Sequence, residues 1–280
     1  MIEAAALVKA AHGLDPLPAT VARLASLVVR PDWSLNEAAH LVEFDPALTG
    51  RLLRLANSAA MAGLSPVNTA RDAIMRVGIG PALAFAAASG LRKQLKRALP
   101  EYGLTEGQLW RHSVASALAV EPIARRARTP VPPECFTAAL LHDIGKIVLA
   151  RFLSPDELKW LAEARDLGGS SLQAEMEVLG VNHAELGGQI AGHWKLPERL
   201  AAGITFHHTP DDGHDLVCDV VYLANIAAKR IGEGVVRAPD EVTAQGSSLT
   251  RLGLTPTVWE DLILTLPASF EATLAQYARD

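Results

Sequence analysis

The sequence has few cysteines, no long apolar run and no leader pattern, and each shortage excludes a class of protein. Only two cysteines occur, Cys135 and Cys218, which is too few for a disulfide framework. Both lie in apolar stretches, so we expect reduced thiols in the core of a cytoplasmic protein. No apolar run reaches the roughly 18 residues that cross a bilayer, and the first residues do not read as a signal peptide. We therefore expect no membrane segment.

Aromatic residues and excess positive charge are also scarce. The net charge of −5 argues against a general nucleic-acid binder, so we expect no nucleic-acid partner. Aromatic residues make up 5% of the chain, alanine and leucine dominate, and no stretch alternates convincingly like a strand. The hydrophobic fraction of 49% is enough for a sizeable core. Together these features predict an all-α protein.

Start and stop signals divide the chain into helices. Ser34 with Glu37, and Thr105 with Gln108, have the spacing of capping boxes. The second pair predicts a helix over residues 105–128, and the next helix is expected to carry the stretch LLHDIGK to about residue 153. The clearest interruption is at residues 100–103. It predicts an N-terminal helical lobe over residues 1–99 and a C-terminal helical lobe over residues 100–280, which together form one module.

The stretch LLHDIGK, residues 140–146, places an imidazole beside a carboxylate. His142 and Asp143 offer the nitrogen and oxygen ligands that a divalent transition metal takes. Lys146 follows one helical turn later, where an ammonium group suits a phosphate oxygen. The alternative is an ordinary helical turn with an ion pair between residues i and i+3. The motif alone does not decide between these interpretations.

Further histidines extend this pattern over four predicted helices. The candidate metal ligands are His112, His142, Asp143, His183 and His207, and His208 lies beside the last of them. Helical bundles build metal sites from side chains on facing helices. Each histidine alone is also explained as a polar residue of a helix face or helix end. Their joint occurrence in one half of the chain favours a metal-binding pocket.

The order and spacing of several motifs resemble the HDOD branch of the HD superfamily of metal-dependent phosphohydrolases, a branch found in bacterial signalling proteins. The matching stretches are LPATVARLASLV (17–28), FDPALTGRLLRLANSAAMAG (44–63), TARDAIMRVG (69–78), WRHSVASA (110–117), LLHDIGK (140–146), VNHAELGGQIAGHWKLPE (181–198), ITFHH (204–208) and VVYLANIAAKRIG (220–232). The resemblance covers nearly the whole chain. It implies an all-α fold of two packed lobes, the second an HD-type helical bundle.

The sequence departs from the hydrolytic members of the superfamily at two positions. Gln108 stands where active relatives often have a glutamate ligand, and Asn225 stands where they have an aspartate. Asp219 cannot replace that aspartate, because six residues at about 100° each place it about 240° around the helix. The Gly-Tyr-Pro signature of cyclic-di-GMP phosphodiesterases is also missing. Asp143 is then the sole anionic ligand, and one metal at most is expected.

These departures favour a regulatory protein over an enzyme. We expect a signal-transduction module that binds a partner protein or a nucleotide-like ligand, with an HD site that holds Fe, Mn, Zn or Ni or no metal at all. The alternative is a metal-dependent phosphohydrolase, in which Lys146 contacts phosphate and His183 or His208 assists the reaction. A third alternative is a sensor that binds a nucleotide without hydrolysing it. The sequence leaves the oligomeric state open.

Overall fold

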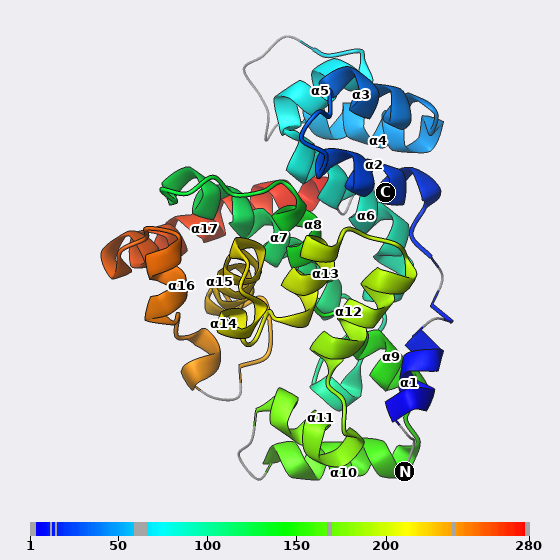
Figure 1. Cartoon of the computed structure of the whole chain (residues 1–280), viewed down its shortest axis with the longest axis vertical. Helices are drawn as coiled ribbons and strands as arrows, with labels where there is room; N and C mark the ends of the chain where they lie inside the picture. Colours follow the sequence, from blue (N-terminus) through cyan, green and yellow to red (C-terminus); the bar gives the residue numbers. More distant parts are fainter. Residues whose placement is uncertain are drawn as a thin grey trace.

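The computed structural model describes residues 4–11, 13–14, 16–58, 66–166, 170–236 and 239–277. Within these ranges the regular structure is helical, apart from a single isolated antiparallel bridge between Leu99 and Leu104. The predicted all-α fold is confirmed. Figure 1 shows α2 to α5 gathered at one end of the molecule and the hairpin of α10 and α11 at the other.

The first helices owe their boundaries to local signals. They are α1 (Ala4–Ala11), α2 (Ala19–Val28), α3 (Leu35–Glu43), α4 (Pro46–Ala56), α5 (Ala70–Val77) and α6 (Ile79–Leu95). Ser34 and Glu37 form the predicted capping box of α3, and the Asp45 side chain accepts from the Leu48 N–H at the start of α4. Helices α2 to α6 pack against one another through leucines and alanines. Helix α1 lies apart from them, against α9 and α12.

The remaining helices build the lobe that carries the histidines. They are η2 (Pro100–Tyr102), α7 (Gln108–Arg126), α8 (Glu134–Leu141), α9 (Gly145–Phe152), α10 (Pro155–Asp166), α11 (Ser171–Leu179), α12 (His183–His193), α13 (Glu198–Thr205), α14 (Pro210–Gly213), α15 (Leu216–Arg230), η3 (Pro239–Val242), α16 (Gly246–Arg251) and α17 (Pro256–Tyr277). Helix α15 lies in the middle and packs against α7, α8 and α13. Its residues from Val217 to Ala228 are all buried. Any polar side chain among them therefore lies inside the protein and needs a partner there.

Helix α6 joins the two halves of the molecule. It contacts α2, α4 and α5 on one side and α7 and α8 on the other. Its buried residues include the unbroken run from Ala82 to Ala88. Small alanine side chains let neighbouring helices approach from several directions, which explains why one helix can pack against both groups of helices.

Two predicted helix boundaries were wrong. The helix that was expected to carry LLHDIGK is interrupted: α8 ends at Leu141 and α9 begins at Gly145, with a turn between them. The helix expected from residue 105 begins at Gln108, because Gly107 with a φ of 82° occupies the N-cap. The Gln108 side chain still accepts from the Thr105 N–H at 2.6 Å, so its link with Thr105 is real although the helix starts later.

No single helix in the described part of the chain is both long and apolar enough to cross a membrane. Helices α5 and α6 satisfy the length and composition criteria only as a pair, and the chain bends by 107° between them.

Candidate metal centre

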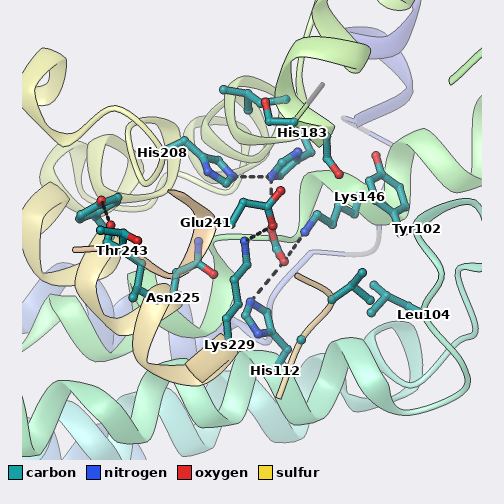
Figure 2. Close-up of a pocket in the computed structure, with 18 of the residues that line it drawn as sticks. Tyr102, Leu104, His112, Lys146, His183, His208, Asn225, Lys229, Glu241 and Thr243 are labelled. Atoms are coloured by element: carbon teal, nitrogen blue, oxygen red, sulfur yellow. Dashed lines mark hydrogen bonds and ion pairs between the residues drawn. The ribbon is translucent and has the colours of Figure 1, made fainter. Parts of the chain in front are cut away.

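The structure brings all six histidine and aspartate candidates together. His112 comes from α7, and His142 and Asp143 come from the turn between α8 and α9. His183 is the first residue of α12, and His207 and His208 follow the end of α13. Figure 2 shows His112, His183 and His208 pointing into one cavity. The ligand atoms form two sets, each within 4.8 Å: His112, His142 and Asp143, and His183, His207 and His208.

Backbone carbonyls fix the tautomers of three of these histidines. The Nδ1 of His112 lies 2.6 Å from the Glu233 oxygen, that of His142 lies 2.7 Å from the Ala139 oxygen, and that of His207 lies 2.7 Å from the Ile204 oxygen. A carbonyl only accepts, so each Nδ1 carries the proton. A neutral imidazole then has a bare Nε2. In all three residues this bare nitrogen is the atom that faces the cluster.

Burial keeps these imidazoles neutral. It lowers the pKa of His112 to about 4 and that of His142 to about 3, although the nearby Asp143 carboxylate acts in the opposite direction. The pKa of His207 is held well below its ordinary value by burial and by the neighbouring imidazole of His208. At neutral pH the three side chains therefore offer lone pairs, which is the form that binds a metal.

The pair His112 and His142 is the part of the cluster that best fits a bound cation. Their Nε2 atoms lie 3.1 Å apart, and neither carries a proton to share. Two lone pairs at that distance repel each other unless a positive charge lies between them. Two nitrogen ligands at about 2.0–2.1 Å from one ion are themselves roughly 3 Å apart. Asp143 Oδ2 lies 3.5 Å from His112 Nε2 and 3.6 Å from His142 Nε2, so a carboxylate completes the set.

The second set has a different electrostatic balance. His183 Nδ1 lies 2.7 Å from Glu175 Oε2, and its Nε2 lies 3.1 Å from His208 Nε2 and 3.3 Å from Asp143 Oδ1. Burial disfavours the charged imidazole, but Glu175 and Asp143 together outweigh it and the pKa of His183 is raised. A protonated His183 can donate to His208 or Asp143, so this set does not need a cation. The expectation of one metal stays a prediction, since two sets of ligand atoms are available.

Asp143 lies between the two sets and also holds Lys146. Its Oδ2 lies 2.6 Å from Lys146 Nζ. Burial opposes ionisation, but Lys146 and the adjacent histidines hold the pKa of Asp143 well below its usual range. Its Oδ1 lies 3.3 Å from His183 Nε2, which can donate to it, whereas His207 Nε2 is buried and has no hydrogen-bond partner among the residues that the structure describes. Buried atoms of this kind need a partner, and a metal ion supplies one.

The two positions that lack a carboxylate lie in different surroundings. The Gln108 side chain is engaged with the Thr105 N–H, three residues before it, and not with the cluster. Asn225 lies on α15 and lines the cavity, and its Oδ1 is buried without a hydrogen-bond partner in the described part of the chain. Asp219 accepts from Ser248 and Arg251, which agrees with the expectation that it does not replace the missing aspartate.

Sequence reasoning missed Glu175 and Tyr102. The buried Glu175 accepts from the backbone N–H of His183 at 2.7 Å, contacts its Nδ1 and accepts from the Tyr102 hydroxyl at 2.9 Å. A carboxylate that binds the far nitrogen of a ligating histidine fixes its ring. The signal that could have indicated Glu175 is its position on the same side of α11 as the apolar residues Ala174 and Leu179, all three of which are buried.

Replacing Glu175 with alanine is expected to lower the free energy of unfolding by about 3–5 kcal/mol, the usual cost of removing one partner from a buried charged pair. His183 would lose the acceptor for two of its donors, and Tyr102 would lose its partner. Urea denaturation measures the change. The matched control is Glu177→Ala on the exposed face of the same helix. Equal stability of the two variants would contradict a supporting role for Glu175.

A cavity of about 370 Å³ opens beside the two sets. Five of the predicted residues line it: His112, Asp143, Lys146, His183 and His208. Its wall also contains Tyr102, Tyr222, Asn225, Lys229, Gly234, Glu241, Thr243 and Gln245. Figure 2 shows Lys146, Lys229 and Glu241 directed into this space. The ligand atoms are thus accessible to a small molecule.

Comparison with known proteins identifies the family. The family model described as HDOD domain matches residues 14–210. The chain belongs to the HDOD family. An HDOD domain protein of unknown function from Geobacter sulfurreducens superposes with a TM-score of 0.72 at 24% identity, over 98% of both chains. The resemblance predicted from the motifs is confirmed.

Three further relatives have the same fold or a related sequence. A candidate phosphohydrolase from Shewanella amazonensis SB2B has a TM-score of 0.69 at 25% identity over 98% of both chains. A candidate signal transduction protein from Marinobacter aquaeolei VT8 has a TM-score of 0.76 at 22% identity, over 95% of this HDOD chain and 59% of that one. An uncharacterized protein of Treponema pallidum (strain Nichols) is 25% identical over 227 residues. The match covers 78% of this chain but only 43% of that protein.

Proposed function

We propose that this HDOD protein is a signalling module that binds one divalent metal ion and a phosphate-bearing small ligand in its C-terminal lobe. The observation that carries the proposal is the pair of bare Nε2 atoms of His112 and His142, 3.1 Å apart beside Asp143. The donor set of imidazole and carboxylate suits Fe, Mn, Zn or Ni. In this proposal the ligand is the input, and a partner protein responds to the occupied state.

The cavity residues support ligand binding beside the metal. A divalent ion, when bound, polarises a phosphoryl oxygen. Lys146, held by Asp143, and Lys229, on the facing wall, provide positive charge for the remaining phosphate oxygens. Gln108 and Asn225 supply no carboxylate, which favours binding over turnover. The name of the Marinobacter relative, a candidate signal transduction protein, agrees with this role.

Elemental analysis tests the proposal. Protein purified without chelators is expected to contain about one transition-metal ion per chain. Inductively coupled plasma mass spectrometry on the native protein measures this content and identifies the element. A metal content near zero in protein that was never exposed to a chelator would overturn the proposed function.

Hydrolysis is the second candidate function, and one feature favours it. The first ligand set opens directly into the cavity that Lys146 and Lys229 line, and the Shewanella relative is named as a candidate phosphohydrolase. The assay is release of p-nitrophenol from bis(p-nitrophenyl) phosphate by the metal-loaded protein. Hydrolysis that disappears in His142→Ala supports an enzyme, and hydrolysis that persists in that variant comes from another source.

A further inference from the structure

One ion pair inside the cavity has no role in holding the metal. Lys229 Nζ, on α15, lies 3.1 Å from Glu241 Oε2, on η3. The two side chains retain 10% and 13% of their exposure, and both line the cavity. Figure 2 shows the Lys229 side chain reaching toward the space between His112 and His208. The pair therefore lies where a ligand of the metal centre would enter.

The pair belongs to a strap that covers one face of α15, made of residues 232–236 and 239–245. At its start the Glu233 carbonyl oxygen accepts from His112 Nδ1. At its end the Tyr222 hydroxyl donates to the Thr243 carbonyl oxygen and accepts from the Gln245 N–H. Tyr222, Asn225 and Lys229 have the spacing of one helix face. The ion pair thus fastens the middle of a strap whose two ends have their own attachments.

Without a metal ion, the charged side chains of the cavity have a net charge of zero. Lys146 and Lys229 contribute two positive charges, Asp143 and Glu241 contribute two negative ones, and a protonated His183 is balanced by Glu175 behind it. A divalent ion adds two further positive charges, so the metal-bound cavity attracts an anion.

A second side chain in the same wall points to a ligand. Asn225 lies one helical turn before Lys229 and is 4% exposed, and its Oδ1 has no hydrogen-bond partner among the described residues. A half-turn of the amide presents its nitrogen as a donor instead. An ammonium group and an amide one turn apart match two oxygens of a phosphate group.

We propose that Lys229 and Asn225 form the anion site for the phosphate group of a small phosphate ester, and that Glu241 occupies this site as an internal competitor until the ligand displaces it. This inference rests on the proposed function, since the ligand is the one that binds beside the metal. It adds the residues that recognise the phosphate and a residue that weakens its binding.

The form of the ion pair distinguishes it from the pairs that fasten the fold. Arg251 makes hydrogen bonds to both oxygens of the buried Asp219, and Arg230 makes two bonds to Glu260. Planar guanidinium groups fix geometry through such paired bonds. Lys229 instead makes one bond with a flexible ammonium group, and an incoming anion can replace the carboxylate without disturbing the ends of the strap.

Binding of inorganic phosphate to the metal-containing full chain tests this site by isothermal titration calorimetry. Glu241→Gln keeps the side-chain shape but removes the competing charge, and it is expected to tighten phosphate binding by about tenfold. Lys229→Met removes the anchor and is expected to weaken binding by at least about tenfold. The matched control is Glu260→Gln. Glu260 pairs with Arg230, which follows Lys229 on α15, and neither residue of that pair lines the cavity. This variant should leave the phosphate affinity unchanged.

The outcomes separate this inference from the proposed function. Equal phosphate affinity in the wild type, Glu241→Gln and Lys229→Met overturns the anion site, as does the absence of phosphate binding in both the wild type and Glu241→Gln. A purely structural ion pair would lower the melting temperature of both variants without changing affinity. Metal content is measured in the same samples. A metal-free protein whose phosphate affinity still responds to the two substitutions would refute the metal proposal alone.

Discussion

Purified His142→Ala should lack the metal ion that we propose for the wild-type protein. The His142 ring is fixed by its bond to the Ala139 carbonyl oxygen and directs a bare Nε2 at His112. Loss of a residue that merely supports a metal ligand costs about 10–100-fold in affinity. Removal of a ligand itself is expected to exceed about a hundredfold. Elemental analysis of protein purified in parallel with the wild type measures the effect.

His40→Ala is the control for this experiment. His40 has an exposed side chain on α3, remote from the cluster, and its imidazole lies beside Glu43 and Phe44. This variant should retain the wild-type metal content. If His142→Ala keeps as much metal as His40→Ala, the first ligand set is not the site that binds it.

Gly145→Ala should cause the largest loss of stability among the substitutions considered for the HDIGK stretch. A Cβ atom at Gly145 would lie 1.9 Å from the His183 carbonyl oxygen, 2.8 Å from its carbonyl carbon and 3.0 Å from the Gly187 nitrogen. All three are backbone atoms of the α12 segment, so no side chain can move aside. The helix itself would have to shift. We expect the free energy of unfolding to fall by about 3 kcal/mol or more, as measured by urea denaturation.

Gly192→Ala is the matched control on α12. A Cβ atom there has no neighbour within 4 Å among the described residues. Alanine has a higher helix propensity than glycine by about 1 kcal/mol, so this variant should be as stable as the wild type or slightly more stable. A Gly145→Ala variant that behaves in the same way would show that α9 and α12 do not approach each other as closely as described.

The features that sequence alone predicted correctly depend on neighbours in the chain. The predicted N-cap Ser34 accepts from a group three residues later, and a sequence pattern detects such a contact directly. The interruption between Leu141 and Gly145 lies against the backbone of a helix nearly forty residues away, and no local pattern contains that contact. Propensity therefore predicted one helix where the structure has two.

The site divides in the same way. The histidines could be grouped because polar side chains on four facing helices of one small bundle converge on its core. Glu175 and the pair of Lys229 with Glu241 could not be found, because charged residues are common and their partners lie on other elements. The role of the histidines as metal ligands is supported by their bare nitrogens and stays a prediction until an ion is measured.

The position of α6 has a consequence for folding cooperativity. Because its alanine-rich surface is covered from both sides, unfolding either half of the molecule strips contacts from a helix that the other half needs. The free energies of the two halves are therefore coupled and not additive. A perturbation in the histidine lobe that shifts α6 is therefore expected to change the energy of the distant helices α2, α4 and α5, which pack against the same helix.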